Sequence, residues 1–324
     1  MKKRNLLIRA IAAGCLMGGS MATFAQDYPT KPVTVMVAIP PGGSVDMVAR
    51  LVSQKLSEEL RQPFLVDNKG GASGQIGTTQ VARAAADGYT LMVAPAAFLA
   101  TNKSVFKSLP YDPEADFAPI SKLVNQSMML VVRSESKYAS AADVISAAKS
   151  RPRTLTYGSA GDGTPHHLAA ALFESRADVQ LLHVPYRGAA PAMNDLLAGT
   201  VDMVFAGLPE ALPYIKSGRL RALGLLSDQR ASVAPQIPTM QEQGLKDMTL
   251  SAWMGLLAPA KTPAHVIERL NRAVHKVLEG DAKARLAETG LEVAPTTASE
   301  FRKIIADEIR LHAALVKSAG IVPQ

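Results

Sequence analysis

The stretch TYGSAGDGTPHHLAAALF, residues 156–173, passes from a short β-rich segment through a glycine-rich loop into a helix-forming segment. Thr164 is a favourable N-cap residue, and Pro165 is a favourable first helical residue because a helix leaves that N–H unpaired in any case. A strand, a loop and a helix in this order form the repeating unit of an open α/β sheet. The loop contains glycine, serine and histidine, so a nucleophile, a metal, a phosphate and a weaker anion contact all remain open at this point.

The same unit repeats through most of the chain, which indicates an α/β protein. The expected strands are 31–39, 64–68, 89–95, 128–133, 155–159, 181–186, 201–207, 220–227 and 250–259. The expected helices are 44–60, 78–86, 140–150, one from Thr164, one closed by Gly199, 263–278, 282–288 and 299–319. Two such series predict two domains, residues 26–126 plus 247–324 and residues 127–246, with crossings near Asn125 and Lys246.

The first 25 residues have the composition of a cleaved secretory signal: a basic start, an apolar stretch and small residues before Ala25. Cleavage near Ala25 predicts a periplasmic protein and removes Cys15, the only cysteine. Lipid attachment at Cys15 is the alternative interpretation. No later stretch has the roughly 18 consecutive apolar residues that a membrane-spanning helix needs.

The formal charge of +7 overstates the basic character of the mature chain, because four of the basic residues lie in the signal. The remaining lysines and arginines are dispersed, with no run and no interleaved aromatic residues. A nucleic-acid surface is therefore not expected. A small positive excess is compatible with a small anionic ligand.

Three loops lead from a strand into a helix through small residues: 40–46, 159–167 and 186–191. The start of a helix has unpaired N–H groups and a partial positive charge, and glycine lets a ligand approach them. Such loops gather at the carboxyl ends of the strands, where open α/β sheets bind ligands. A purely connecting role is the alternative for each loop taken alone.

The motifs of familiar enzymes and metal sites do not fit. Tyr157 stands where the G-x-S-x-G elbow of hydrolases needs glycine, and no P-loop or dinucleotide spacing occurs. His166 and His167 are neighbours, so a helix directs them about 100° apart and they do not form a zinc pair. We therefore expect no catalytic residue, no metal and no cofactor. His167 is expected to hydrogen-bond within its own loop and His183 to be packed.

Five further polar residues are interpreted from their positions, and two of them, Asp46 and Arg187, have open roles. His265, His275 and His312 are together interpreted as helix-surface residues. Asp46 either favours its helix dipole or accepts a hydrogen bond from a ligand. Arg187 either pairs with a ligand carboxylate or is a solvated surface residue.

Six motifs in order carry a family resemblance: PPGGSVDMVAR, DNKGGASGQIGT, LTYGSAGDGTPHHLAAALF, HVPYRGAAPAMNDLLAGTVDMVFAG, GRLRALGLLSDQR and WMGLLAPAKTP. Together the chain resembles the Bug-type, TctC-like extracytoplasmic solute receptors of tripartite tricarboxylate transporters. The resemblance implies a two-domain periplasmic-binding-protein fold of the Venus-flytrap, type II-like kind, with two crossing strands. It also implies a monomer that closes on a small carboxylate, such as an aliphatic or aromatic dicarboxylate, and delivers it to membrane permease subunits.

The same resemblance implies a ligand site on both domains, in which the loops hold a carboxylate between them, partly through ordered water. The residues carried over are Ile39, Pro40, Gly42, Gly43 and Asp46 on one domain, and Ser159, Ala160, Gly161, Gly163, Thr164, His167, Tyr186, Arg187 and Gly188 on the other. The sequence departs from the family at Ile39, where an aromatic residue is common, and at Lys69, where arginine is usual. An aliphatic Ile39 would leave room for a bulkier acid.

Two other functions remain open. A sensor that signals the bound carboxylate to a partner would have the same site, and its partner surface has no sequence motif. An exported enzyme acting on a carboxylate would need a nucleophile in contact with a base, and the sequence names no such pair.

Overall fold

The computed structural model describes residues 28–323. The predicted signal, its cleavage near Ala25 and the lipidation alternative at Cys15 lie outside the described residues. The strands are β1 (Val33–Val37), β2 (Phe64–Asn68), β3 (Thr90–Pro95), β4 (Phe117–Arg133), β5 (Thr156–Ser159), β6 (Leu182–Pro185), β7 (Met203–Gly207), β8 (Leu220–Leu225), β9 (Ser251–Pro259) and β10 (Leu291–Val293). The helices are α2 (Ser44–Leu60), η1 (Ala72–Gly74), α3 (Gln75–Ala82), η2 (Ala97–Thr101), α4 (Asn102–Val105), α5 (Ala141–Ser150), α6 (Pro165–Ala177), α7 (Ala189–Ala198), α8 (Leu208–Lys216), α9 (Ala264–Glu279), α10 (Asp281–Glu288) and α11 (Ala298–Ser318).

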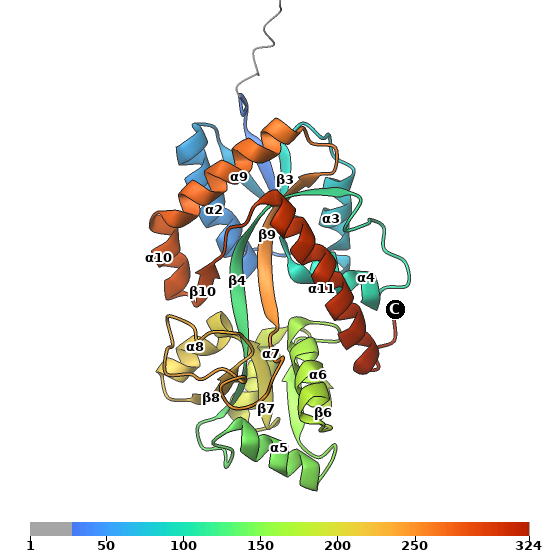
Figure 1. Cartoon of the computed structure of the whole chain (residues 1–324), viewed down its shortest axis with the longest axis vertical. Helices are drawn as coiled ribbons and strands as arrows, with labels where there is room; N and C mark the ends of the chain where they lie inside the picture. Colours follow the sequence, from blue (N-terminus) through green and yellow to red (C-terminus); the bar gives the residue numbers. More distant parts are fainter. Residues whose placement is uncertain (1–27, 324) are drawn as a thin grey trace, which may run out of the picture.

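Two domains share one continuous set of strands. The strand order is β2-β1-β3-β9-β4-β7-β5-β6, with β8 and β10 also paired to β4. β4 is 17 residues long, and it passes from the upper domain to the lower one in Figure 1, beside β9. It pairs with β9 from Phe117 to Ser127, and it pairs with β7 from Met128 onward. The change of partner after Ser127 places the crossing between the domains in the middle of β4.

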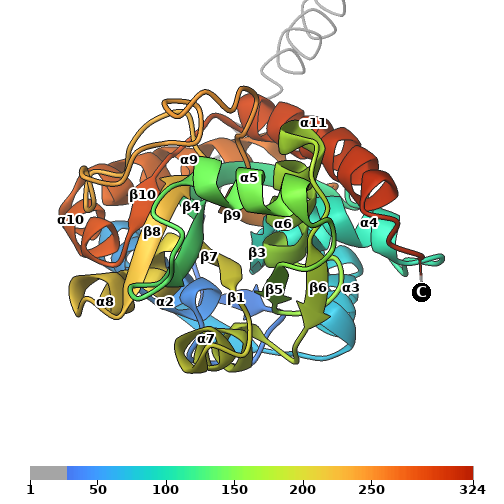
Figure 2. The same ribbon diagram turned by 90° about the horizontal axis from the view of Figure 1, so that it is seen from below.

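Each domain has helices on both faces of its sheet. In the upper domain, α2, α9 and α10 pack on one face, while α3, η2 and the start of α11 pack on the other. In the lower domain, α5 and α6 cover one face, and α7 and α8 cover the other, as the view from below shows (Figure 2). α11 is shared, because Phe301 lies in the upper core whereas Leu315 and Val316 lie in the lower core.

The strand directions bring the loops of the two domains face to face. β1 is parallel to β3, β3 is antiparallel to β9, and β9 is antiparallel to β4, so β1 points the same way as β4, toward the lower domain. β7 is antiparallel to β4 and parallel to β5, which is parallel to β6, so these strands point toward the upper domain. The carboxyl ends of both sets of parallel strands therefore meet at the boundary between the domains, where such folds bind ligands.

The structure differs from the sequence interpretation at several elements. β4 begins at Phe117, not near residue 128, because the buried polar residues of its first half hide the strand pattern. The sequence interpretation also missed η2, α8 and the short β10. The expected division at residues 126/127 and 246/247 stays a proposal, and β4 crosses the first of these boundaries without interruption.

The assignment of His312 to a helix surface was wrong. His312 is only 4% exposed, and its Nδ1 lies 2.8 Å from Thr101 Oγ1 on η2. His265 is exposed and His275 half-buried, as a helix-surface position allows. Among residues 28–323, no helix combines the length and the apolar character needed to cross a membrane.

Candidate functional site

The loop between β1 and α2 is exposed to solvent, and the buried carboxylate of Asp46 fixes its conformation. Residues 40–43 are exposed, whereas the Asp46 side chain is buried. Asp46 Oδ2 accepts from Gly42 N at 2.9 Å and from Arg50 Nε at 3.0 Å, and Asp46 Oδ1 accepts from Asn68 Nδ2 at 2.9 Å. Asp46 thus fixes the loop through Gly42 N and connects it, through Asn68, to the end of β2.

These contacts also set the charge of Asp46. Burial alone would raise the pKa of its carboxyl group, but the hydrogen bonds from Arg50, Gly42 and Asn68 outweigh burial and lower it. Asp46 is therefore ionised at neutral pH while its oxygens are already occupied. Both Asp46 oxygens already accept hydrogen bonds from the protein, which favours a positioning role, and contact of Asp46 with a ligand stays a prediction.

The loop between β5 and α6 is closed by its own side chains. Ser159 is fully buried, and its Oγ accepts from Gly161 N at 3.1 Å. Thr164 is the N-cap residue of α6, as expected, but its side chain makes no capping hydrogen bond. Its Oγ1 donates instead to Gly161 O at 2.7 Å. The two hydroxyl groups therefore shape the loop, and the groups left for a ligand belong to the backbone.

The two adjacent histidines have different partners, which agrees with their expected divergence. His167 Nδ1 accepts from Gly163 N at 3.3 Å, so this ring hydrogen-bonds within its own loop, as predicted. His166 Nε2 lies 2.9 Å from Glu210 Oε2 on α8. His166 therefore connects α6 to α8 within the lower domain.

The third loop follows β6 and lies against the second. Gly188 N donates to Ala160 O at 3.2 Å, and Tyr186 N donates to Ser159 O at 3.0 Å. Tyr186 Oη donates to Asp195 Oδ2 at 2.6 Å, and burial together with this carboxylate raises the pKa of Tyr186 to about 12. Arg187 is exposed and makes no hydrogen bond or ion pair with any other described residue.

Three helices begin at the domain boundary with N–H groups that have no acceptor among residues 28–323. These are Ser44 and Val45 at the start of α2, His166 and His167 at the start of α6, and Ala189 and Ala190 at the start of α7. Gly42 and Gly188 stand just before two of these helices, and a Cβ at either position would meet nothing within 4 Å. Unpaired N–H groups with open space above them are suited to bind an anion.

A cavity of about 350 Å³ lies where the domains approach each other. From the upper domain, Phe98, Asn102 and Val105 line it, and from the lower domain, Gly163 and Thr164. The approach is close, because a Cβ at Gly163 would lie 2.8 Å from Val105 Cγ1. The loop at residues 40–43 is outside the lining of this cavity. The loop at 159–167 therefore lies directly at the domain boundary. The position of the loop at 40–46 near that boundary follows only from the direction of β1.

The structure contains a serine–histidine contact that the sequence did not reveal. Ser159 Oγ lies 2.6 Å from His183 Nε2, and Asp162 Oδ1 lies 3.6 Å from His183 Nδ1. The parallel pairing of β5 with β6 brings the two residues together, and only the correct strand pairing would have shown this from the sequence. The group does not have the geometry of a hydrolase triad, since 3.6 Å is too long for the second hydrogen bond and Ser159 is fully buried.

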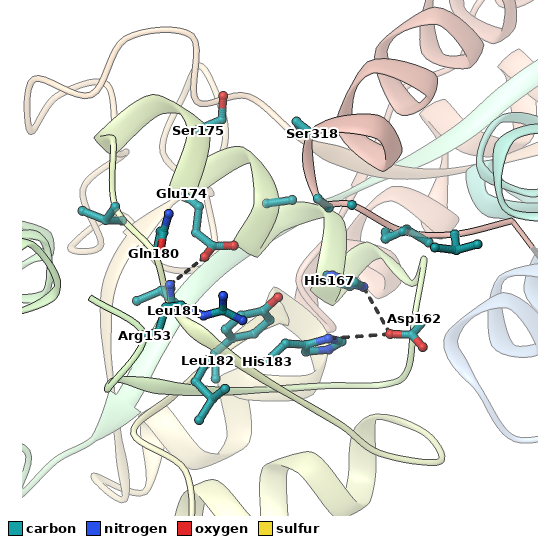
Figure 3. A pocket seen from close by; sticks show the side chains of 17 residues that line it. Arg153, Asp162, His167, Glu174, Ser175, Gln180, Leu181, Leu182, His183 and Ser318 are labelled. Carbon is teal, nitrogen blue, oxygen red and sulfur yellow. Dashed lines mark hydrogen bonds and ion pairs between the residues drawn. The ribbon is translucent and has the colours of Figure 1, made fainter. Parts of the chain in front are cut away.

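A larger cavity, of about 850 Å³, lies on the outer side of the same loop. It is bordered by β6, by α6 and by the segment after α11, and Arg153, Asp162, His167, Glu174 and His183 line it (Figure 3). Burial raises the pKa of Glu174 despite a hydrogen bond from Leu181 N, and burial lowers the pKa values of His167, to about 4, and of His183. Both imidazoles are therefore neutral at pH 7.

Comparison with known proteins decides the family. Residues 48–321 match the family described as the tripartite tricarboxylate transporter family receptor, TctC. The chain belongs to this family. It is 36% identical over 298 residues to BugT of Bordetella pertussis, which covers 91% of each chain. It is 37% identical over 293 residues to a protein of the tcbD–tcbE intergenic region of Pseudomonas sp. strain P51, covering 90% of this chain and 87% of that one.

Solved structures of periplasmic binding proteins are similar to this chain in sequence and in fold. The R. palustris protein Rpa4515 with adipate is 34% identical, with a TM-score of 0.82 over 92% of this chain and 100% of that one. The periplasmic binding protein BugD is 32% identical, with a TM-score of 0.77 over 92% and 100% of the two chains. MatC from Rhodopseudomonas palustris with bound malate is 30% identical, with a TM-score of 0.76 over 89% and 100%.

These findings confirm the resemblance to Bug-type receptors and the two-domain α/β periplasmic-binding-protein fold. The family consists of periplasmic substrate-binding receptors, not of enzymes, and works with tripartite transporters. The individual site residues carried over from the family stay predictions.

Proposed function

We propose that this chain captures a small dicarboxylate, aliphatic or aromatic, in the periplasm and delivers it to the permease subunits of a tripartite tricarboxylate transporter. The observation that carries the proposal is the convergence of three helix N-termini, those of α2, α6 and α7, on the domain boundary. Relatives with known structures hold adipate and malate, both of which are dicarboxylates. Export of the chain by cleavage near Ala25 is part of the proposal.

The backbone supplies the recognition of the anion. The Ser159 and Thr164 hydroxyls are occupied within their loop, whereas the N–H groups at the starts of the three helices have no described acceptor. Each helix start also has a partial positive charge, which favours a carboxylate without burying a full charge on the protein. A ligand with a carboxylate at each end can satisfy donors of both domains at once.

A ligand with two carboxylate groups would favour the closed arrangement of the domains. One carboxylate binds the upper loop and the other the lower loops, so all contacts exist together only when the domains approach. A ligand that makes more contacts with the closed form increases the population of that form. Bending in the middle of β4 and in β9 provides the hinge, and the closed form then docks on the permease.

Ile39 and Arg187 are expected to affect which acid is bound. Ile39 is half-buried, and its Cδ1 would lie 3.8 Å from a Cβ at Gly43, so it forms the side of the first loop. Arg187 is exposed beside Gly188 and has no described partner, which leaves its guanidinium available for a carboxylate.

The experiment is isothermal titration calorimetry of the chain from residue 26 to residue 324 with adipate, malate and an aromatic dicarboxylate. We expect one of these to bind at one ligand per chain, and its monoamide, which has the same size but one charge less, to bind at least about 10-fold more weakly. Equal affinity for the acid and its monoamide would contradict the proposed recognition. Mass spectrometry of the supernatant from denatured protein checks for an acid that co-purifies and blocks the site.

A further inference from the structure

Three possible metal ligands meet at the edge of the 850 Å³ cavity. One nitrogen of His167, one nitrogen of His183 and one oxygen of Asp162 all lie within 4.8 Å of one another. Asp162 Oδ1 is 3.7 Å from His167 Nδ1 and 3.6 Å from His183 Nδ1, and the close-up shows the carboxylate directed at both rings (Figure 3). The residues come from the loop after β5, from α6 and from β6.

Hydrogen bonds constrain which ring nitrogens of this group carry a hydrogen. His167 Nδ1 accepts from Gly163 N, so it is unprotonated. Ser159 Oγ is able to donate its hydrogen to Gly161 O at 3.2 Å while accepting from His183 Nε2 at 2.6 Å. In that tautomer His183 Nδ1 is also unprotonated. Both Nδ1 atoms lie near one carboxylate oxygen, and the only hydrogen directed at His167 Nδ1 by a described residue is that of Gly163 N, over a long 3.3 Å; a cation, or a water molecule, can join the three groups.

The two imidazole rings lie close together, and His167 is buried. His167 is only 7% exposed, and the rings of His167 and His183 lie 4.0 Å apart between centroids. Neutral imidazole is the form that binds transition metals.

We propose that Asp162, His167 and His183 form a binding site for a divalent transition-metal ion of the zinc class. In a tetrahedral zinc site with bonds of roughly 2.0–2.2 Å, ligand atoms lie about 3.4 Å apart. The two carboxylate–nitrogen separations exceed this by a few tenths of an ångström, and the two rings, whose centroids are 4.0 Å apart, would rotate apart to direct both nitrogens at one ion. The cavity leaves the fourth position open to water or to a ligand anion.

The surroundings of the site support a metal. Ser159 would orient His183 by accepting from the nitrogen that does not bind the ion, which is the usual arrangement behind a metal-binding histidine. The ion would displace the hydrogen bond from Gly163 N to His167 Nδ1, and that bond is long, at 3.3 Å. Glu174 and Arg153 line the same cavity with opposite charges.

His167 also belongs to the start of α6, one of the helix N-termini of the proposed function, but the metal site uses its side chain and the inference does not depend on that function. Asp162 nevertheless also lines the cavity between the domains, so the ion would fix the loop that the carboxylate is proposed to contact. No metal was predicted from the sequence, because His166 and His167 are neighbours and because the approach of His183 to this loop depends on the pairing of β5 with β6.

The test uses the mature chain without a polyhistidine tag, stripped with a chelator and titrated with Zn²⁺ in competition with a chromogenic zinc indicator. We expect one Zn²⁺ per chain with a dissociation constant of about 1 µM or lower. Asp162→Asn and His183→Gln should each weaken binding at least about 10-fold. His265→Gln, at an exposed position on α9, is the matched control and should bind as the wild type does.

A folding defect is distinguished from a lost ligand by the melting temperature in chelator, which should be unchanged for Asp162→Asn because Asp162 is exposed. The visible absorption of bound Co²⁺ provides a second readout, and Asp162→Asn should change it. The proposal would be wrong if the wild type binds no stoichiometric Zn²⁺, or if all three variants bind it equally. Carboxylate binding by the stripped protein is measured separately, so failure of either proposal leaves the other intact.

Discussion

Gly163 meets two separate constraints. Its φ is +70°, in the left-handed region, and a Cβ there would lie 2.8 Å from Val105 Cγ1 on α4. The first constraint belongs to the loop alone, while the second belongs to the fit between the domains. Gly218 shares only the first constraint, because its φ is +74° and a Cβ would meet nothing within 4 Å.

Gly163→Ala should therefore affect both folding and ligand binding, whereas Gly218→Ala should affect folding alone. We expect each variant to lose about 1 kcal/mol of unfolding free energy from the positive φ. Only Gly163→Ala should also lose ligand affinity, by about 10-fold, because the methyl group holds the domains apart. Calorimetry of both variants and of the double variant Gly163→Ala/Val105→Ala measures this. The prediction fails if removing the Val105 side chain restores no affinity.

Asp46 stabilises the fold in a pH-dependent way. Because its folded-state pKa is lower than in the unfolded chain, it contributes stability above the unfolded value of about 3.9, and this is lost as pH falls through the folded value. Asp46→Asn should lower the unfolding free energy at pH 7 by about 1.5–3 kcal/mol. The difference from the wild type should shrink below about pH 4. Urea unfolding at several pH values tests this, and a constant difference would contradict it.

Individual residues were predictable where a local pattern determines them. Thr164 and Pro165 were correctly placed at the start of α6, because capping preferences act over a few residues. The Ser159–His183 contact was not predictable, because it depends on the register between β5 and β6. His312 was misassigned because its polar ring hid the spacing that puts it in line with Ile305 and Leu315, two buried residues of α11.

At the scale of elements, β4 shows why the crossing was only partly predicted. Its second half, from Met128, is a continuous apolar run, and it was recognised as a strand. Its first half contains Pro119, Asn125 and Gln126, which are unusual in a strand, and its pairing with β9 has register shifts at two places. The helices, by contrast, were predicted to within a few residues, because apolar spacing determines them locally.

α11 joins the domains beside the crossing strands (Figure 1). It contacts η2 and α4 of the upper domain, and its last turns pack against α6 of the lower domain. Its buried His312 lies within 2.8 Å of Thr101 on η2 through Nδ1. His312 Nε2 and Glu308 Oε2 are 3.0 Å apart but are not aligned as a hydrogen bond, so Thr101 is the hydrogen-bond partner of the ring.

Thr101→Val should therefore destabilise the protein by about 1–3 kcal/mol, because it leaves a buried ring nitrogen without its partner. Thr154→Val is the matched control: the Thr154 hydroxyl also makes a hydrogen bond, to Arg151 O, but it is exposed. We expect the control to change stability by less than about 0.5 kcal/mol. The prediction is contradicted if chemical denaturation gives the same loss of unfolding free energy for both variants, because the Thr101–His312 hydrogen bond would then add no more stability than an exposed one.

At the scale of the whole molecule, the account rests on strand direction. The parallel strands of the two domains point at each other, so three helix starts lie at one boundary although they are far apart in the sequence. The sequence predicted the loops, the two domains and the family. It did not predict that the Ser159 and Thr164 side chains would be used up within their loop, because that depends on the loop conformation.

The most direct test of backbone recognition is amide NMR of the ¹⁵N-labelled, deuterated mature chain during titration with the dicarboxylate that binds in calorimetry. The account predicts the largest amide shifts at the starts of α2, α6 and α7, from both domains together and at one ligand per chain. Asp46→Asn should reduce the shifts at the start of α2 only, since it loosens the loop that Asp46 holds. Shifts confined to the cavity around Arg153, Glu174 and His183, with none at residues 42–45, would contradict the central claim.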